Sequence, residues 1–68
     1  MRIRNLREDR DLTQQEIANY LHINQNTYSQ YENGQRKIPL EYLIALAKLY
    51  NTSTDYILEL TDKREPYE

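Results

Sequence analysis

Two helix-start signals lie close together in the first half of the chain. Thr13 is followed three residues later by Glu16, the spacing of a capping box, in which each side chain bonds the other residue's backbone N–H. Asn24 is the second signal, because its short side chain can accept from the free N–H groups at a helix start. Gly34 can take the left-handed conformation that closes a helix. Residues 13–34 are therefore predicted to form two short helices joined by a tight turn.

Apolar residues recur at helical spacing along the whole chain. The inward stripes are Ile3 and Leu6; Ile17, Ala18 and Leu21; Tyr28 and Tyr31; and Leu40, Leu43, Leu46, Ala47 and Tyr50. The last helix has the apolar positions Tyr56, Ile57 and Leu60, not all of which can be buried in so small a domain. This pattern predicts an all-α fold, a compact bundle of five helices at 1–10, 14–21, 25–33, 39–50 and 53–60.

The chain has 68 residues, which allows one small domain and no second one. We assign 1–60 to that domain, with the two-helix unit at 13–33, and 61–68 to a polar C-terminal tail. There are no cysteines and no apolar run near the roughly 20 residues that cross a bilayer. The start, MRIRNLREDR, lacks the apolar core of a signal peptide. We expect a cytoplasmic protein without a disulfide or a membrane span.

The third helix, 25–33, carries an unusual outer surface. Gln25, Asn26 and Gln30, called here the amide face, lie on one exposed side of it. A Gln or Asn amide holds a donor beside an acceptor and so matches the N6 and N7 edge of adenine in the major groove. A helix surface selected for solubility would carry Glu and Lys, yet 24–31 holds no charge. The amide face is therefore predicted to contact DNA bases.

Side chains beside the amide face suit the backbone of a nucleic acid. Thr27 and Ser29 are small and polar, so they would let the two backbones come close. Arg36 and Lys37 follow the third helix directly, with Asn33 at its end, and suit a phosphate strand at the edge of a groove. The alternative is an ordinary solvated loop, which is how most surface charges behave.

The net charge of −2 argues against a nucleic-acid partner at first sight, because phosphate contacts usually come with a basic surface. The charge is unevenly distributed. Residues 1–37 hold six basic and five acidic groups, giving +1, and residues 38–68 hold three basic and six acidic groups, giving −3. The acidic excess is thus remote in sequence from the amide face, and weak non-specific DNA binding is expected.

The order of motifs over about 3–60 resembles a known family. The resemblance is carried by LTQQEIA at 12–18, YENGQR at 31–36 and NTSTDYIL at 51–58, and by Leu21, Ile23, Asn24, Thr27, Tyr28, Pro39, Leu40, Glu41, Leu43, Leu46 and Ala47. In these residues the chain is similar to the Cro/repressor-type helix-turn-helix domains of phages and bacteria, often called the XRE family. That resemblance implies a lambda-repressor-like DNA-binding fold with the helix-turn-helix at the second and third helices.

The resemblance also implies roles that the pattern alone leaves open. It implies a phosphate contact at Gln14, at the start of the second helix, with Gln15 and Asn24 as further backbone candidates. It implies that Arg7 pairs with Glu32 and ties the first helix to the third. The alternatives are a solvated Gln and two solvated surface charges.

His22 stands where most members of the resembled family carry Gly, at a turn position that often has positive φ. A metal ligand or pH switch is a possible role for a histidine, but the chain has no second His and no Cys to complete a site. We therefore interpret His22 as a turn residue and expect no metal and no cofactor.

Two functions follow from these observations. The first is a sequence-specific double-stranded DNA-binding transcriptional regulator, with repression as the expected effect. We expect it to work as a homodimer through helix 53–60, because one such domain makes too few contacts for tight binding. The alternative is an antitoxin or anti-repressor that uses the same fold to bind a protein. An enzyme is not supported, since the sequence shows no nucleophile with a base and no Gly-rich phosphate loop.

Overall fold

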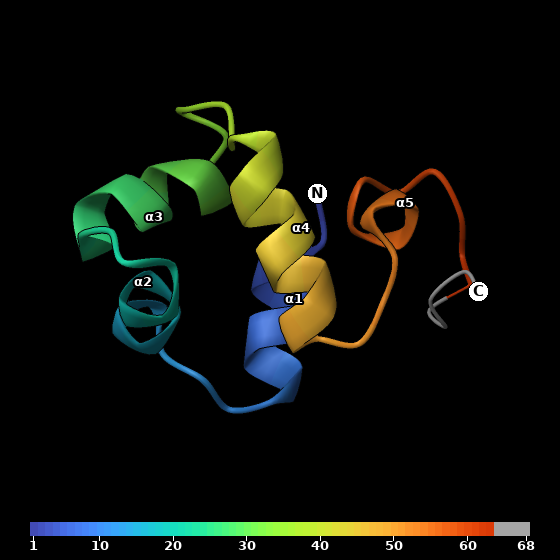
Figure 1. Ribbon diagram of the computed structural model, residues 1–68, viewed down its shortest axis with the longest axis horizontal. Coiled ribbons are helices and arrows are strands. Elements are labelled where there is room, and N and C mark those ends of the chain that lie inside the picture. The colour runs from blue at the N-terminus through green and yellow to red at the C-terminus, as the bar shows by residue number, and fades with distance from the viewer. Residues whose placement is uncertain (64–68) are drawn as a thin grey trace.

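The computed structural model describes residues 1–63, and these form an all-α domain. Its helices are α1 (Ile3–Asp9), α2 (Gln14–Leu21), α3 (Gln25–Glu32), α4 (Leu40–Leu49) and α5 (Thr54–Ile57) (Figure 1). The prediction of an all-α, five-helix domain is confirmed. Of the predicted tail, 61–68, residues 64–68 lie outside the described residues.

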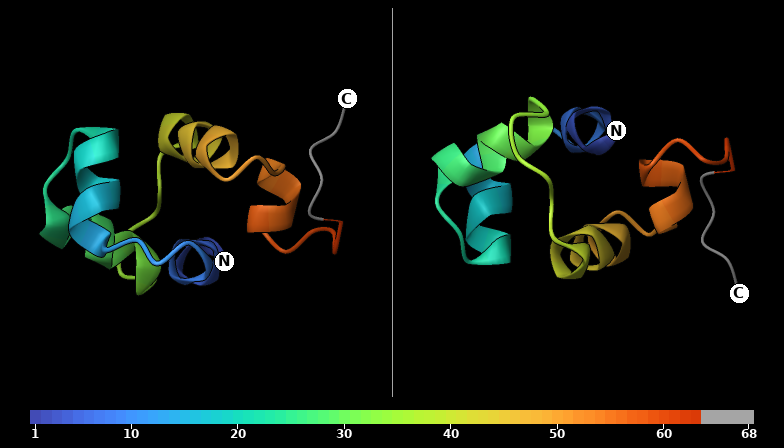
Figure 2. Two further views of the ribbon diagram at one scale, coloured as in Figure 1. Left: turned by 90° about the horizontal axis from the view of Figure 1, so that it is seen from below. Right: turned by 90° about the horizontal axis from the view of Figure 1, so that it is seen from above.

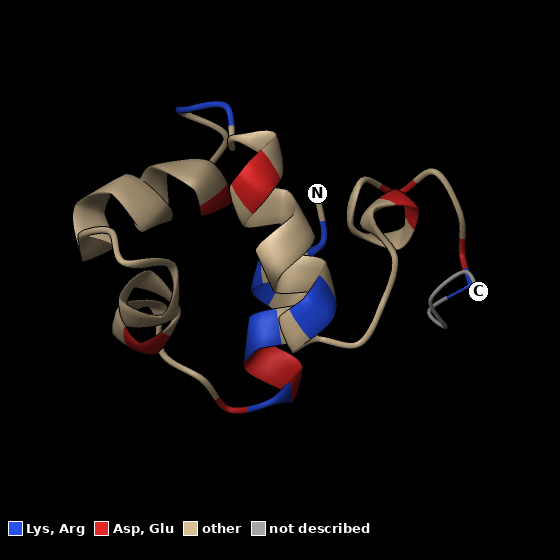
Figure 3. Cartoon of the chain, in the orientation of Figure 1, with Lys and Arg blue, Asp and Glu red and all other residues tan. Residues whose placement is uncertain are grey.

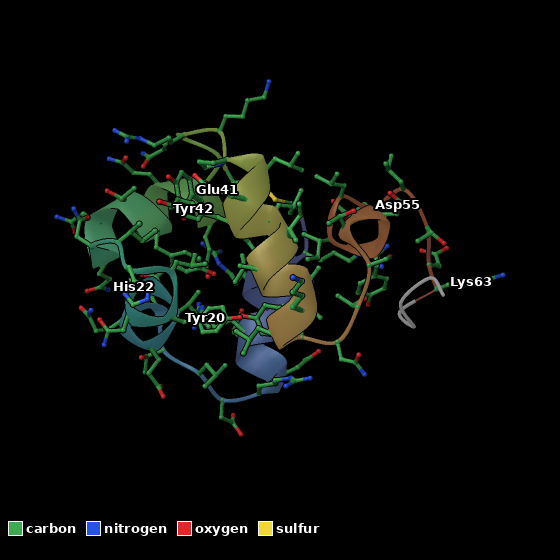
Figure 4. All side chains as sticks on the ribbon, in the orientation of Figure 1. Tyr20, His22, Glu41, Tyr42, Asp55 and Lys63 are labelled. Carbon is green, nitrogen blue, oxygen red and sulfur yellow. The ribbon has the colours of Figure 1, made fainter. Side chains whose placement is uncertain are left out.

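Local side-chain bonds set the starts of α2 and α3. The Thr13 hydroxyl accepts from the Glu16 backbone N–H at 3.1 Å, and the Glu16 carboxylate accepts from the Thr13 N–H at 2.9 Å. The Asn24 side-chain oxygen accepts from the Thr27 N–H at 2.8 Å. Between the two helices His22 has φ 60°, in the left-handed region (Figure 4). The two start signals read from the sequence therefore operate as capping groups in the structure.

Every helix contributes to one apolar core. The buried residues are Ile3, Leu6, Ile17, Ala18, Leu21, Tyr28, Tyr31, Leu43, Leu46, Ala47, Tyr50 and Ile57. Tyr31 of α3 also lies against Tyr42 of α4, with ring centroids 6.2 Å apart (Figure 4). Because the inner side of α3 is held by this core, its outer side has a fixed orientation.

The fifth helix is shorter than predicted. It ends at Ile57 rather than Leu60, because the chain reverses there: Glu59 has φ 64°, and the Leu60 N–H donates to the Asp55 carbonyl at 2.8 Å. This closing turn satisfies the free carbonyl groups at the helix end. As a result Leu60 points outward and is 72% exposed, while Ile57 is the buried residue of the three apolar positions expected there.

The predicted starts of two other helices also need correction. α1 begins at Ile3, because the Arg2 N–H donates to the Ile57 carbonyl of α5 at 2.9 Å and so belongs to a tertiary contact. Pro39 precedes α4 in an extended conformation instead of forming its first turn. Leu40 is then the first residue of α4 and is 68% exposed, against the prediction that it belongs to the buried stripe.

The pair α2–α3 and the short α5 lie at opposite ends of the molecule, which measures 32 × 22 × 18 Å (Figures 1 and 2). Arg2 connects the start of α1 to α5 and to the segment that follows it. Its guanidinium lies 4.2 Å from the centre of the Tyr56 ring and donates to Asp62 at 3.0 Å. Asp62 is thereby held at the α5 end of the molecule. Within the described residues, no helix has the length and apolar character needed to cross a membrane.

The structure of the core predicts that two leucines of α4 contribute very differently to the free energy of unfolding. Leu46 is fully buried and Leu40 is exposed, so Leu46→Ala should lower the free energy of unfolding by about 2–5 kcal/mol, through lost burial and the cavity left behind. Leu40→Ala is the control and should change it by less than about 0.5 kcal/mol. Urea unfolding followed by circular dichroism measures both. Equal losses would contradict the position of α4 described here.

Candidate nucleic-acid interface

The amide face lies on the outer side of α3. Gln25 and Asn26 are exposed and Gln30 is half-buried, while the tyrosines of α3 point into the core. Figure 3 shows α3 free of charge until Glu32, its last residue. Along most of its length, α3 thus presents hydrogen-bonding groups rather than charges to solvent.

The small residues beside the amide face are partly exposed. Thr27 and Ser29 each leave part of their surface open, and Asn24 is exposed while its side-chain oxygen caps α3. These three side chains are short. At these positions the backbone of a binding partner can therefore approach the backbone of α3 closely.

At the end of α3, the side chain of Glu32 has no exposed surface and is paired with Arg7 of α1. Arg7 Nε donates to one carboxylate oxygen at 2.7 Å and Arg7 Nη2 donates to the other at 3.2 Å. A further Arg7 nitrogen donates to the Leu12 carbonyl at 2.9 Å. This bidentate ion pair joins α1 to α3 and also holds the loop that leads into α2.

The surroundings of Glu32 keep it ionised. Burial by itself would raise the pKa of Glu32, but the hydrogen bonds from Arg7 and Gln14 outweigh it and hold the pKa below its ordinary value. The same pair raises the pKa of Arg7. Burial raises the pKa of Tyr50 to about 12 and that of Tyr28 further, so both phenols stay neutral.

Gln14 connects the buried pair to the amide face. Its Nε2 donates to Glu32 at 3.1 Å, and its Oε1 accepts from Gln25 Nε2 at 3.3 Å. The Gln14 side chain is therefore held by two protein groups instead of pointing freely to solvent. The backbone N–H of Gln14, in the first turn of α2, stays at the helix N-terminus, where a phosphate is favoured.

The other residues predicted to contact a DNA backbone make different hydrogen bonds within the protein. Gln15 is exposed and donates to Asn19 one turn along α2 at 2.9 Å. Asn33 caps the end of α3, accepts from Arg4 Nη2 at 2.8 Å and donates to Ser29 at 3.4 Å. Asn33 is thus oriented by its neighbours while remaining exposed.

Arg36 and Lys37 lie in the exposed loop between α3 and α4, drawn in blue in Figure 3. The backbone of this loop is held to α3, because the N–H groups of Gln35 and Arg36 both donate to the Gln30 carbonyl, at 2.9 and 3.2 Å. Gly34, with φ 75°, makes the turn possible. Two cations are therefore placed next to the C-terminal end of α3.

One cation near α3 was not identified from the sequence. Arg4 is half-exposed and lies between Glu32, at 3.4 Å, and Asn33. The signal was available, since Arg4 precedes Arg7 by three residues and so shares its side of α1. It could not be used without knowing that α1 crosses the end of α3. The structure thus adds Arg4 to the cations around this surface.

Comparisons with known proteins agree on a family. A family model described as Helix-turn-helix matches residues 3–57. The uncharacterized HTH-type transcriptional regulator YobD of Bacillus subtilis is 43% identical over 65 residues, which is 96% of this chain and 58% of YobD. The cryptic phage CTXphi transcriptional repressor RstR of Vibrio cholerae is 47% identical over 49 residues, 72% of this chain and 44% of RstR.

A relative of another class matches as well. The antitoxin PezA of Streptococcus pneumoniae is 37% identical over 51 residues, 75% of this chain and 32% of PezA. The chain spans about half the length of YobD and of RstR. No solved structure matches it. The relatives therefore bear on this domain and not on whatever else their longer chains contain.

The Arg7–Glu32 pair predicts stability that depends on pH. Arg7→Met leaves a buried carboxylate without its partner and should cost about 3 kcal/mol near neutral pH. The pKa of Glu32 is depressed in the folded state, so its contribution is present above the ordinary Glu pKa of about 4.3 and is lost as pH falls through the folded-state pKa. The difference between wild type and variant should therefore shrink as pH falls below about 4.3.

Urea unfolding at a series of pH values measures this difference. Arg36→Met is the matched control, since Arg36 is exposed, and it should change the free energy of unfolding by less than about 0.5 kcal/mol at every pH. A difference for Arg7→Met that stays constant down to pH of about 3 would show that Glu32 is not the group responsible.

Proposed function

The chain belongs to the helix-turn-helix family, and from this and the geometry of α3 we propose that it is a sequence-specific double-stranded DNA-binding regulator of transcription. The observation that carries the proposal is the amide face, which is uncharged, exposed at Gln25 and Asn26, half-buried at Gln30, and backed by the apolar core. An α-helix fits the major groove of B-DNA, where Gln and Asn can make paired hydrogen bonds to adenine. We assign base contacts to Gln25, Asn26 and Gln30.

The proposed backbone contacts surround α3. Arg36 and Lys37 hold phosphates on one side, and the N-terminus of α2 at Gln14 holds a phosphate on the other. Asn33 adds a contact at the end of α3, with Arg4 behind it. Gln15, Asn24, Thr27 and Ser29 line the close approach to the backbone. A cytoplasmic location is part of the proposal.

Repression is the favoured effect, since RstR is named a transcriptional repressor. The name of PezA supports the second function, an antitoxin on the same fold. An antitoxin can also bind DNA, so the presence of a protein partner, rather than the absence of DNA binding, separates the two.

We propose that two copies bind neighbouring half-sites. Exposed Leu58 and Met1 lie at a groove that is also lined by Ile38, Arg36 and Lys37. A second copy seated there would lie alongside the same duplex, because Arg36 and Lys37 belong to the phosphate-facing loop. Domains of this kind bind half-sites about 34 Å apart, one helical turn. We therefore assign the dimer contact, expected through helix 53–60, to the residues at the end of α5.

Substitutions on α3 and in the loop should have different effects on DNA binding. Gln25→Ala and Gln30→Ala should each remove preference for particular base pairs, by about 1–3 kcal/mol per lost paired contact. Arg36→Ala should weaken binding to all sequences alike and reduce the dependence on salt. Selection from randomised duplexes, followed by titration at several salt concentrations, measures both. Unchanged preference in both Gln variants would remove the base contacts from α3, and no duplex bound by wild type at low salt would overturn the proposed DNA-binding function.

The proposed dimer predicts that substitutions at two residues of similar exposure affect self-association differently. Leu58 is 42% exposed at the groove, and Ile44 is 41% exposed and lines a separate depression with Lys48 and Thr54. Leu58→Glu should prevent self-association and weaken binding to a two-half-site duplex about tenfold or more, with little effect on a single half-site. Ile44→Glu should leave both unchanged. Sedimentation and titration test this, and equal effects would place the dimer contact elsewhere.

A further inference from the structure

Asn33 is the one asparagine of the chain that is followed by a glycine. Each of the others precedes a residue that carries a side chain: Asn5, Asn19, Asn24, Asn26 and Asn51. An asparagine amide can react with the backbone nitrogen of the next residue, and a glycine there leaves that nitrogen unshielded. Asn33 and Gly34 are both exposed, with open space where a Cβ of Gly34 would stand. Sequence and surface thus leave Asn33 accessible to this reaction.

The reaction is an intramolecular substitution followed by the addition of one water. The Gly34 backbone nitrogen loses its proton to solvent, attacks Cγ of Asn33 and closes a five-membered imide ring. The bond between Cγ and Nδ2 breaks, and the amide nitrogen leaves as ammonia, which takes up a proton. Water then adds to one of the two ring carbonyls, and the C–N bond at that carbonyl breaks. The product is an aspartate, or its isomer linked through the side chain, with one added negative charge.

The structure holds Asn33 out of the reactive geometry. Its ψ is −3°, so the Gly34 nitrogen eclipses the Asn33 backbone nitrogen, whereas ring closure needs the Gly34 nitrogen beside Cβ. The side-chain amide is held at both ends: Arg4 Nη2 donates to Oδ1 at 2.8 Å, and Nδ2 donates to Ser29 Oγ at 3.4 Å. The Gly34 N–H donates to the Tyr31 carbonyl at 3.3 Å. The peptide must therefore rotate, and the amide must leave Arg4, before the ring can close.

Arg4 makes the strongest of these contacts. Its hydrogen bond to Asn33 is short and charge-assisted, whereas the other two bonds are long and join neutral groups. Arg4 also lies 3.4 Å from Glu32, which Arg7 anchors, so its guanidinium is kept beside Asn33. A reaction that needs local opening proceeds in proportion to the population of the open form. Arg4 therefore lowers the rate by lowering that population.

We propose that Asn33 is a site of spontaneous deamidation whose rate is restrained by Arg4, and that its conversion to aspartate weakens DNA binding. The second part rests on the proposed function, which places Asn33 at a phosphate. Conversion replaces a neutral amide with a carboxylate, which repels a phosphate. The isomer also lengthens the main chain by one carbon, just before the loop that carries Arg36 and Lys37. The age of the protein thereby limits how long it holds DNA.

Mass spectrometry of the protein kept at mildly alkaline pH measures the conversion, and sequencing of tryptic peptides locates it. Wild type should convert slowly and first at Asn33, and Asn33→Gln should lose this product. Arg4→Met should convert about threefold to tenfold faster, the factor expected for the loss of one hydrogen bond. Arg10→Met is the matched control and should keep the wild-type rate, because Arg10 is also exposed and also donates two hydrogen bonds, to the Leu49 and Tyr50 carbonyls.

The rates separate the restraint from the stability of the fold. No product at Asn33 in either wild type or Arg4→Met, or an earlier product at another asparagine, overturns the site. Equal rates in wild type and Arg4→Met overturn the restraint. An equal increase in Arg4→Met and Arg10→Met also overturns it, because a general loosening of the domain would then be the cause.

Titration of the duplex selected by wild type tests the effect on DNA. Asn33→Asp carries the charge of the product and should weaken binding to all sequences alike, by about threefold or more. Asn51→Asp adds the same charge at an exposed position between α4 and α5 and should bind as wild type does. Equal affinity of the three proteins overturns the effect on DNA. No duplex bound by wild type overturns the proposed function instead, and leaves the conversion measured by mass spectrometry as it stands.

Discussion

The buried bond between Glu32 and Arg7 is the interaction on which the arrangement of this domain depends. Glu32 ends α3, Arg7 lies on α1, and the same two residues hold the start of α2 through Gln14 and the Leu12 carbonyl. A carboxylate with no exposed surface is unfavourable unless its oxygens are bonded, so the three helices must meet at this point. The pair thereby fixes the angle at which α3 is presented.

The apolar core gives this arrangement its rigidity. A domain of this size buries a modest core, and here every helix contributes to it. Tyr28 and Tyr31 occupy the inner side of α3, which leaves its outer side free for polar residues without loss of stability. α5 lies at the end of the molecule opposite α2 and the start of α3 (Figure 1), so part of the net charge of −2 is remote from the start of α3. Two exposed cations and a half-exposed third, Arg36, Lys37 and Arg4, lie at the C-terminal end of α3.

Local signals allowed much of the fold to be predicted. The caps at Thr13 and Asn24 act within a few residues of their own positions, so they can be recognised without a tertiary structure. Helix ends were less predictable. The apolar pattern extended the last helix to Leu60, but the chain turns after Ile57, since a reversal at Glu59 satisfies the helix carbonyls. Leu40 likewise fits the stripe of its helix, yet it lies beyond the edge of the core.

The sequence by itself determined the helices, their inner faces and the chemical character of α3, because these follow from propensity, capping and spacing along one segment of chain. Only the tertiary structure decided which side chains meet. The orientation of Gln14 between Glu32 and Gln25, and the place of Arg4 beside Asn33, arise where three helices come together. Such contacts join residues far apart in sequence, and their geometry depends on helix crossing angles that no local pattern encodes.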